Sequence, residues 1–142
     1  MIHFLSLVKE PFELISHEEK VIEMRLFDEK RKKIRIGDYI IFTYEDKHIL
    51  VKITSLQIFH DFKELYAFYP KSHLGYKMNE EASYKDMYRY YNDEQIEKYG
   101  TLAIGIKLIK EVEIKDISTS SLTFIYEGKE YVRTFEEFEA HL

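Results

Sequence analysis

Residues 20–42 read KVIEMRLFDEKRKKIRIGDYIIF, and this stretch carries the strongest structural signals of the chain. Its first part alternates: the apolar Ile22 and Met24 fall on one side of an extended backbone, and Glu23 and Arg25 fall on the other. This alternation predicts a half-buried strand. Such a strand would present a carboxylate and a guanidinium together on its polar face.

The second part of the stretch predicts a hairpin. Gly37 and Asp38 form a turn signal that opens a strand over residues 39–44, which is apolar on both faces and is therefore predicted to be central in its sheet. The polar residues 45–47 join it to a further strand over residues 49–58.

The segments on either side of this stretch add helices. A short apolar run predicts a first strand, Pro11 starts a helix, Asp61 caps a second helix, and Ser83 precedes a third. Asp93 is predicted to cap a short helical turn that ends at Gly100.

The strand predicted over residues 101–109 has large side chains on one face and small ones, Thr101, Ala103 and Gly105, on the other. Small residues on one strand face indicate that another backbone or a ligand comes close. Further strand signals follow at residues 112–117, 122–126 and 130–132, and then a helical turn opens with Thr134 and Glu137 as a capping box. The order of elements predicts an α+β fold: a small antiparallel or mixed β-barrel with inserted and flanking helices.

The composition is that of a soluble globular domain. The chain has 142 residues, enough for one domain, and its 45% hydrophobic and 33% charged residues argue against disorder. Without cysteine it has no disulfide, no thiolate zinc site and no cysteine nucleophile. No apolar run approaches the roughly 20 residues that cross a bilayer, and no signal peptide is visible. We therefore expect a cytoplasmic protein without a membrane partner.

Missing motifs exclude several enzyme and cofactor classes. The six histidines never fall at the spacing that places two imidazoles on one helix face, so no metal site is expected. The chain has no glycine-rich phosphate loop, no P-loop and no serine nucleophile elbow. We expect no cofactor.

Charge is distributed unevenly along the chain. The net charge is −5, and residues 111–142 account for all of it, because they hold eight acidic side chains against three basic ones. Residues 1–110 are neutral overall but contain a basic run, Lys30 to Lys33 followed by Arg35. This run is either a solvated turn or a phosphate-contacting patch that the acidity of the whole chain masks.

The densest cluster of polar function comprises Lys20, Glu23, Arg25, Asp28 and Arg31. It is either the solvated face of a strand and its turn, or a rigid charge pair that binds a polar ligand, because Glu23 and Arg25 share a strand face. A regular strand would place Lys20 on the opposite side from Glu23. Lys20 joins the cluster only if it lies in the turn before the strand.

Tyrosine is the unusual residue of this composition. Eight of the 12 tyrosines lie between Tyr66 and Tyr99, where most of them are expected to pack between helices and sheet. A tyrosine combines a flat stacking face with a polar tip, so a tyrosine-lined groove also suits splayed-out bases. Tyr76, in a loop, and Tyr90, off the apolar side of its helix, are the candidates for such contacts.

The segments PFELISHEEKVIEMRLFDEKRKKIRIGDYIIF, FHDFKELY, LGY and YYNDEQIEKYGTLAIGIKLI, in this order, resemble the ASCH domain (activating signal cointegrator homology) of the PUA-like superfamily. The resemblance covers residues 1–110. It leaves residues 111–142 as an acidic C-terminal β-hairpin and short helix, which we expect to pack on the barrel. In the family signature glycine-x-lysine-x-x-glutamate-x-arginine, the last three positions are Lys20, Glu23 and Arg25 here.

Other parts of the family pattern also occur. A Gly-Asp turn stands at residues 37–38, and a Tyr-Gly pair precedes the closing strand at residues 99–100. The signature glycine is replaced by Glu18, so a differently shaped turn between the first helix and the strand is expected.

The resemblance implies a small PUA-like β-barrel with helices around a cleft that the signature strand lines, and it implies binding of RNA or other nucleic acid there. A subgroup similar in fold is an amidohydrolase that removes the acetyl group from N4-acetylcytidine, using a lysine and a threonine on the signature strand with a downstream glutamate. Lys20 fits the lysine, and Glu23 stands at the threonine's position. Glu80 or Glu81 fits the downstream acid.

An RNA- or nucleotide-binding domain is the favoured function. In it Glu23 would accept from a base amino group, and Tyr76 and Tyr90 would stack on bases. The phosphate contacts would come from Arg25, Arg31 and Lys32, and Lys20 would also contact the ligand.

Two alternatives of other classes stay open. In a small amidohydrolase for an acylated nucleoside, Lys20 would activate water and Glu23 or Glu81 would carry the proton. In a protein-interaction domain, residues 111–142 would dock a partner. The sequence leaves the oligomeric state undetermined.

Overall fold

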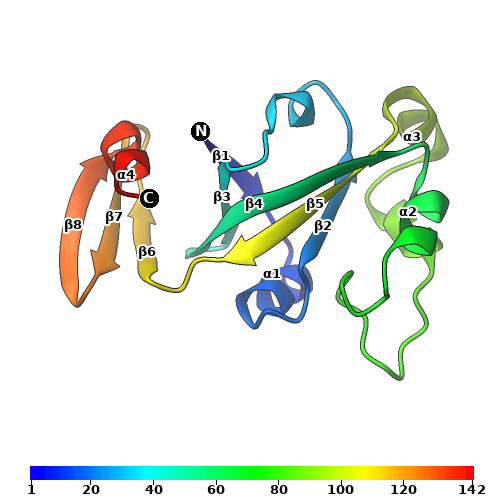
Figure 1. Ribbon diagram of the computed structural model, residues 1–142, viewed down its shortest axis with the longest axis horizontal. Coiled ribbons are helices and arrows are strands. Elements are labelled where there is room, and N and C mark those ends of the chain that lie inside the picture. Colours follow the sequence, from blue (N-terminus) through cyan, green and yellow to red (C-terminus); the bar gives the residue numbers. More distant parts are fainter.

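The computed structural model describes all residues, 1–142, and has a five-stranded sheet at its centre (Figure 1). The strands follow the order β1-β3-β4-β5-β2 across the sheet, with β1 parallel to β3 and the other neighbours antiparallel. Their bounds are β1 (Ile2–Ser6), β2 (Ile22–Leu26), β3 (Tyr39–Tyr44), β4 (Lys47–Phe59) and β5 (Thr101–Leu108). The sheet curls into a half-barrel whose edges are β1 and β2, which confirms the predicted α+β fold class.

The centre of the sheet matches the hairpin that the sequence predicts. Ile40, Ile41 and Phe42 of β3 are fully buried, so both faces of this strand are covered. Strand β4 pairs with β3 through its first half and with β5 through its second half, and the register shifts between Ile53 and Ser55. This bulge bends β4, so one long strand serves both halves of the curled sheet.

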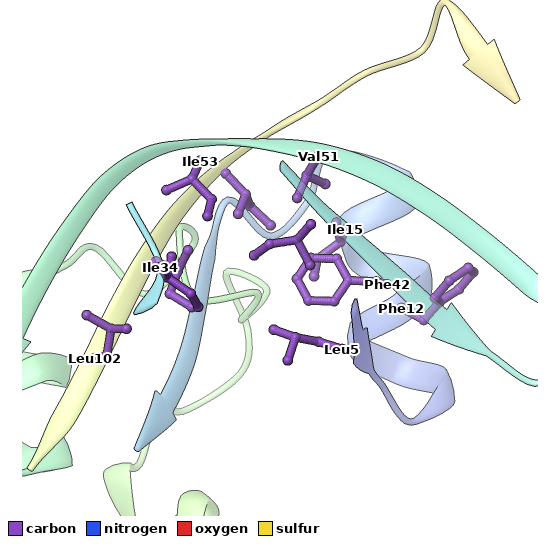
Figure 2. Packing of buried hydrophobic residues seen from close by; sticks show 11 residues of the cluster. Leu5, Phe12, Ile15, Ile34, Phe42, Val51, Ile53 and Leu102 are labelled. Carbon is purple, nitrogen blue, oxygen red and sulfur yellow. The ribbon is translucent and has the colours of Figure 1, made fainter. Parts of the chain in front are cut away.

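One apolar core fills the inner side of the half-barrel (Figure 2). Helix α1 (Lys9–Ser16) contributes Phe12 and Ile15 to this core. The helix begins two residues before Pro11 rather than at it, which is tolerated because the N–H groups of the whole first turn lack partners within the helix. The core residues are Leu5, Phe12, Ile15, Ile34, Ile40, Phe42, Val51, Ile53, Leu102, Ile104 and Ile106.

A second core lies on the outer side of β2 and β5, under a cap made of helix α2 (Phe62–Phe68), the 3₁₀ helix η2 (Tyr84–Arg89) and helix α3 (Asp93–Tyr99). In Figure 1 this cap stands at the far end of the two longest strands. The cap buries Ile22, Met24, Leu26, Phe62, Leu65, Leu74, Met87, Ile96 and Ala103.

The small face of β5 is explained by a neighbouring strand. A Cβ atom added to Gly105 would lie 2.0 Å from the Ser55 hydroxyl, across the bulge in β4. At Gly100, which ends α3 at φ 71°, an added Cβ would lie 3.1 Å from the carbonyl oxygen of Phe59. The close approach that the sequence predicts is therefore made by β4 and its end.

The helices of the cap differ in detail from the sequence-based expectation. The segment after Ser83 is a 3₁₀ helix of six residues with a single buried side chain, Met87, because the chain turns into α3 before an α-helix could continue. Helix α3 is capped by Asn92 rather than Asp93, and Gln95 completes the capping box. Asp61 caps α2 as predicted, accepting from the backbone N–H of Glu64 at 2.8 Å.

The C-terminal residues form a separate three-stranded antiparallel sheet and a helix. The elements are β6 (Val112–Ile117), β7 (Ser121–Tyr126), β8 (Lys129–Thr134) and α4 (Phe135–His141), and the predicted Thr134–Glu137 capping box is present. Phe124 and Phe138 pack with Ile41 and Leu50, which lie on the outer face of β3 and β4. No helix of the protein is both long enough and apolar enough to traverse a membrane.

Candidate functional site

A cleft of about 500 Å³ opens beside the two unpaired edges of the half-barrel. The end of β1, helix α1 and strand β2 form one part of its lining, and the loop after α2 together with η2 forms the rest. Its volume is within the range of small-molecule sites in proteins. The buried charges of the signature strand lie in this lining.

The register between β2 and β5 shows why Glu23 and Arg25 face the inner side. Glu23 lies opposite Ile104, and Arg25 lies opposite Leu102. Directly opposed residues share a face of a sheet, and both partners belong to the inner core. The predicted alternation is confirmed, but the expectation of a half-exposed polar face is wrong: Glu23 is only 4% exposed.

Lys20 lies just before β2 rather than in it. Its side chain is therefore free of the strand alternation and can lie on the same side as Glu23. Its side chain is 6% exposed, and its Nζ donates to the carbonyl oxygen of Leu74 at 3.2 Å. The same Nζ is 3.7 Å from Glu23 Oε1. An ammonium group has three N–H donors, so one remains available to a ligand in the cleft.

Glu23 holds Arg25 as well as Lys20. Arg25 Nε donates to Glu23 Oε2 at 3.1 Å, and the backbone N–H of Met24 donates to Oε1 at 3.1 Å. Arg25 Nη2 also donates a hydrogen bond to the carbonyl oxygen of Ser6 at 2.9 Å. Because Ser6 ends β1, this bond bridges the two edge strands that the backbone leaves unpaired.

Burial has a direct electrostatic consequence at Lys20. Loss of solvation lowers the pKa of its ammonium group below the ordinary value of 10.5, the nearby Glu23 carboxylate opposes this shift, and Arg25 adds to it. A lysine in this setting loses its proton more easily than an exposed one. It can therefore serve as a donor or, once deprotonated, as a base.

The loop after α2 holds Lys20 in place. His73 accepts through its carbonyl oxygen from the backbone N–H groups of Val21 and Ile22, both at 3.0 Å. Gly75 has φ 98°, and a Cβ atom added to it would lie 3.2 Å from Leu14 and 3.3 Å from the stem of Lys20. The left-handed backbone favours a glycine here and the space beside it is tight, and the glycine in LGY is the sequence signal for this contact.

The turn between α1 and β2 is formed without a glycine. Glu18 adopts φ 59°, in the left-handed region that favours glycine, and its carboxylate pairs with Lys110 at 2.7 Å. The turn therefore keeps the left-handed backbone conformation that a glycine would favour, although Glu18 stands at this position.

Four tyrosines line the cleft: Tyr66, Tyr76, Tyr90 and Tyr91. Tyr90 is 50% exposed, whereas Tyr76 is half-buried and its hydroxyl is engaged by Tyr66 at 2.8 Å and by Asp86 at 2.7 Å. Burial raises the pKa of the Tyr66 and Tyr91 hydroxyls. The pKa of Tyr76 is raised further, by burial first and then by its bonds to Tyr66 and Asp86.

Other predicted site residues lie outside the lining of the cleft. Arg31 begins the 3₁₀ helix η1 (Arg31–Lys33) and pairs with Asp28 at 2.8 Å, and Lys32 pairs with Glu29 at 3.0 Å. Two members of the basic run, Arg31 and Lys32, are thus paired with acids of their own turn. Both candidate downstream acids are exposed, and of the two only Glu80 lines the cleft.

Three charged residues of the lining, Glu10, Asp86 and Arg89, were missed by the sequence analysis because no motif marks them. With them, the lining has three cationic and four acidic side chains: Lys20, Arg25 and Arg89 against Glu10, Glu23, Glu80 and Asp86. The cleft is therefore close to neutral. No group of three or more His, Asp or Glu side chains is placed to hold a metal ion.

Comparison with known proteins gives a family and two close structural neighbours. Residues 5–110 match the family model of the ASCH domain. The crystal structure of hypothetical protein PH0355 aligns with a TM-score of 0.66 and 34% identity, covering 77% of this chain and 100% of that one. The solution NMR structure of protein PF0455 from Pyrococcus furiosus aligns with a TM-score of 0.59 and 31% identity, covering 78% and 99%.

A more distant structure shows the fold alone. The crystal structure of a mutant of ZmASCH from Zymomonas mobilis aligns with a TM-score of 0.50 and 16% identity, covering 82% of this chain and 73% of that one. No curated protein matches the chain. About a quarter of this chain has no counterpart in PH0355 or PF0455, although both are matched over essentially their whole length.

Proposed function

The chain belongs to the ASCH domain family, and from that premise we propose that its cleft binds the base of a nucleotide or nucleoside, free or within a single-stranded RNA. The observation that carries this proposal is the buried Lys20–Glu23–Arg25 cluster in the lining of the cleft. Buried charges are costly unless they are paired, so a cluster kept at a concave surface indicates a polar ligand.

The cluster presents polar atoms without presenting free charge. Glu23 neutralises one of its two cations and holds both of them at fixed distances. Lys20 retains a free N–H, which suits a carbonyl oxygen or ring nitrogen of a base. Such rigid donors recognise heterocycle edges at little entropic cost.

The near-neutral lining favours a base over a phosphate chain. Its cationic and acidic side chains nearly cancel, and Arg31 and Lys32 of the basic run pair with acids outside the cleft. Tyr90, which is 50% exposed, adds aromatic surface to the lining, and stacking on such a ring is worth about 1–3 kcal/mol per base. The phosphate contacts expected of Arg31 and Lys32 have less support than the base contacts.

The test is direct binding of nucleosides, nucleotides and short single-stranded RNAs, screened by thermal shift and measured by calorimetry. A ligand that binds the folded state raises its apparent stability by mass action. Lys20→Met should abolish binding, and Lys107→Met, which removes an exposed lysine from β5, should leave it unchanged. The proposal fails if no member of the panel binds, or if Lys20→Met binds as well as the unmodified protein.

Hydrolysis of an acylated nucleoside is the second candidate, and the lowered pKa of Lys20 is what favours it. A neutral Lys20 would take a proton from a water molecule that attacks the acyl carbon, and the leaving amine would receive a proton. Glu80, in the lining, is the downstream acid that this candidate would use. Incubation with N4-acetylcytidine decides between the two: release of acetate and cytidine supports hydrolysis, and binding without turnover leaves a binding module.

A further inference from the structure

The cleft contains a chain of three hydrogen-bonded groups that the proposed function does not use. Tyr66, on α2, bonds through its hydroxyl to the hydroxyl of Tyr76 at 2.8 Å. The Tyr76 hydroxyl in turn lies 2.7 Å from Asp86 Oδ2. All three residues line the cleft, and they come from α2, the following loop and η2.

The direction of this chain follows from counting protons. A tyrosine hydroxyl has one proton to donate, and a carboxylate only accepts. Tyr76 therefore donates to Asp86, and the second group on that side, the carbonyl oxygen of Ser83 at 3.5 Å, is also only an acceptor. With its proton committed there, Tyr76 can only accept from Tyr66.

The same argument fixes what Tyr66 offers to the cleft. Its proton points to Tyr76, so the part of its hydroxyl that remains is a lone pair. We propose that Tyr66 is a specificity-determining residue: it acts as a fixed hydrogen-bond acceptor that selects ligands with an N–H donor, and Asp86 sets its direction through Tyr76. This inference rests on the proposed function of the cleft.

Lys20 supplies the complementary half of the recognition. Its free N–H is a donor and Tyr66 is an acceptor, and both side chains line the cleft. A base that carries an exocyclic amine beside a ring nitrogen or carbonyl, such as cytosine or adenine, offers the matching pair. A ligand that lacks the N–H leaves the Tyr66 oxygen unpaired in a desolvated position, which weakens binding.

The experiment compares ligands that differ only in the amine. Cytidine is paired with pyrimidin-2-one riboside, and adenosine with purine riboside, and affinities are measured by calorimetry. The unmodified protein should prefer the amino member of a pair by about fivefold to tenfold, the worth of one such hydrogen bond. In Tyr66→Phe the two members should bind equally.

Of two further variants, one tests the direction of the hydrogen-bond chain and the other is a control. Asp86→Asn should reduce the preference, because an amide can donate to Tyr76 and so release Tyr66 from its fixed role. Tyr126→Phe should keep the preference, since Tyr126 lies on β7, outside the lining of the cleft.

The outcomes separate this inference from the function it rests on. If the unmodified protein binds none of the ribosides, the proposed function is overturned. If it binds them and Tyr66→Phe keeps the same preference for the amine, only the role of Tyr66 is overturned.

Discussion

Two lysine–glutamate pairs of the same spacing lie in the stretch 20–32, and one is buried in the cleft whereas the other is exposed. Lys20 and Glu23 are three residues apart, as are Glu29 and Lys32. The first pair is separated by 3.7 Å, and both of its side chains are 6% exposed. The second pair is separated by 3.0 Å, with the Lys32 side chain 47% exposed and the Glu29 side chain 84% exposed. The shorter distance belongs to the exposed pair, whose loss is expected to cost less stability.

Solvent explains the difference. An exposed ion pair typically contributes about 0–1 kcal/mol, because water solvates the separated charges nearly as well. A buried pair gains little in net stability, but removal of one partner leaves the other buried without compensation. The comparison teaches that the burial of a charged pair, and not its spacing in the sequence, decides what the loss of one partner costs.

The largest expected effect comes from the shared carboxylate of the buried cluster. Glu23→Gln leaves Lys20 and Arg25 without a counter-charge, and we expect it to lower the free energy of unfolding by about 3–5 kcal/mol. Glu29→Gln is the matched control and should change it by no more than about 0.5 kcal/mol. Urea denaturation of both variants measures the difference, and equal losses would show that burial does not distinguish the two pairs.

The pH dependence of stability should sharpen the same comparison. Burial lowers the pKa of Lys20 in the folded state below 10.5, so the unfolded state binds this proton more tightly. Between the lowered value and 10.5, rising pH therefore stabilises the fold through Lys20. The unfolding free energy of the unmodified protein minus that of Lys20→Met should therefore rise as the pH increases toward 10.5.

Lys32→Met is the control for this measurement. It removes a lysine from the exposed pair and reports the slope that any lysine replacement produces. Urea denaturation across the alkaline range gives both differences. A difference for Lys20→Met that shrinks as the pH rises would mean that attraction to Glu23, rather than burial, dominates at Lys20.

The smallest expected effect concerns the backbone that leads into the cluster. Glu18 at φ 59° carries left-handed strain of about 1–2 kcal/mol. Glycine removes that strain but costs about 0.5–1 kcal/mol in chain entropy, so Glu18→Gly should stabilise the protein by about 0.5 kcal/mol. Glu18→Ala keeps the strain and removes the exposed pair with Lys110, and its thermal midpoint should not rise. A higher midpoint for both variants would assign the effect to the carboxylate instead.

Most of the fold could be predicted because its signals are local. Alternation predicted β2, a run that is apolar on both faces predicted the central β3, and Asp61 and Thr134 marked helix starts. The end of the third predicted helix could not be found this way. Helical spacing continues through Tyr91, but tertiary packing turns the chain at Asn92.

The site was predictable in its residues but not in its surroundings. Alternation placed Glu23 and Arg25 on one face, yet only the pairing of β2 with β5 shows that this face points inward. Asp86 and Arg89 enter the lining through a 3₁₀ helix that carries no sequence signature. Contacts between distant segments, such as Gly75 on the stem of Lys20, are set by the curl of the sheet.

The packing of the C-terminal unit bears on how chain length becomes fixed in evolution. The family match ends at residue 110, and two related structures have no counterpart for about a quarter of this chain. Yet Ile41 and Leu50, within the family domain, are buried beneath the added sheet and α4. Once these positions are apolar, loss of residues 111–142 would expose them to water and favour self-association. The addition is therefore entrenched: a lineage could shed it only after making the surface beneath it polar.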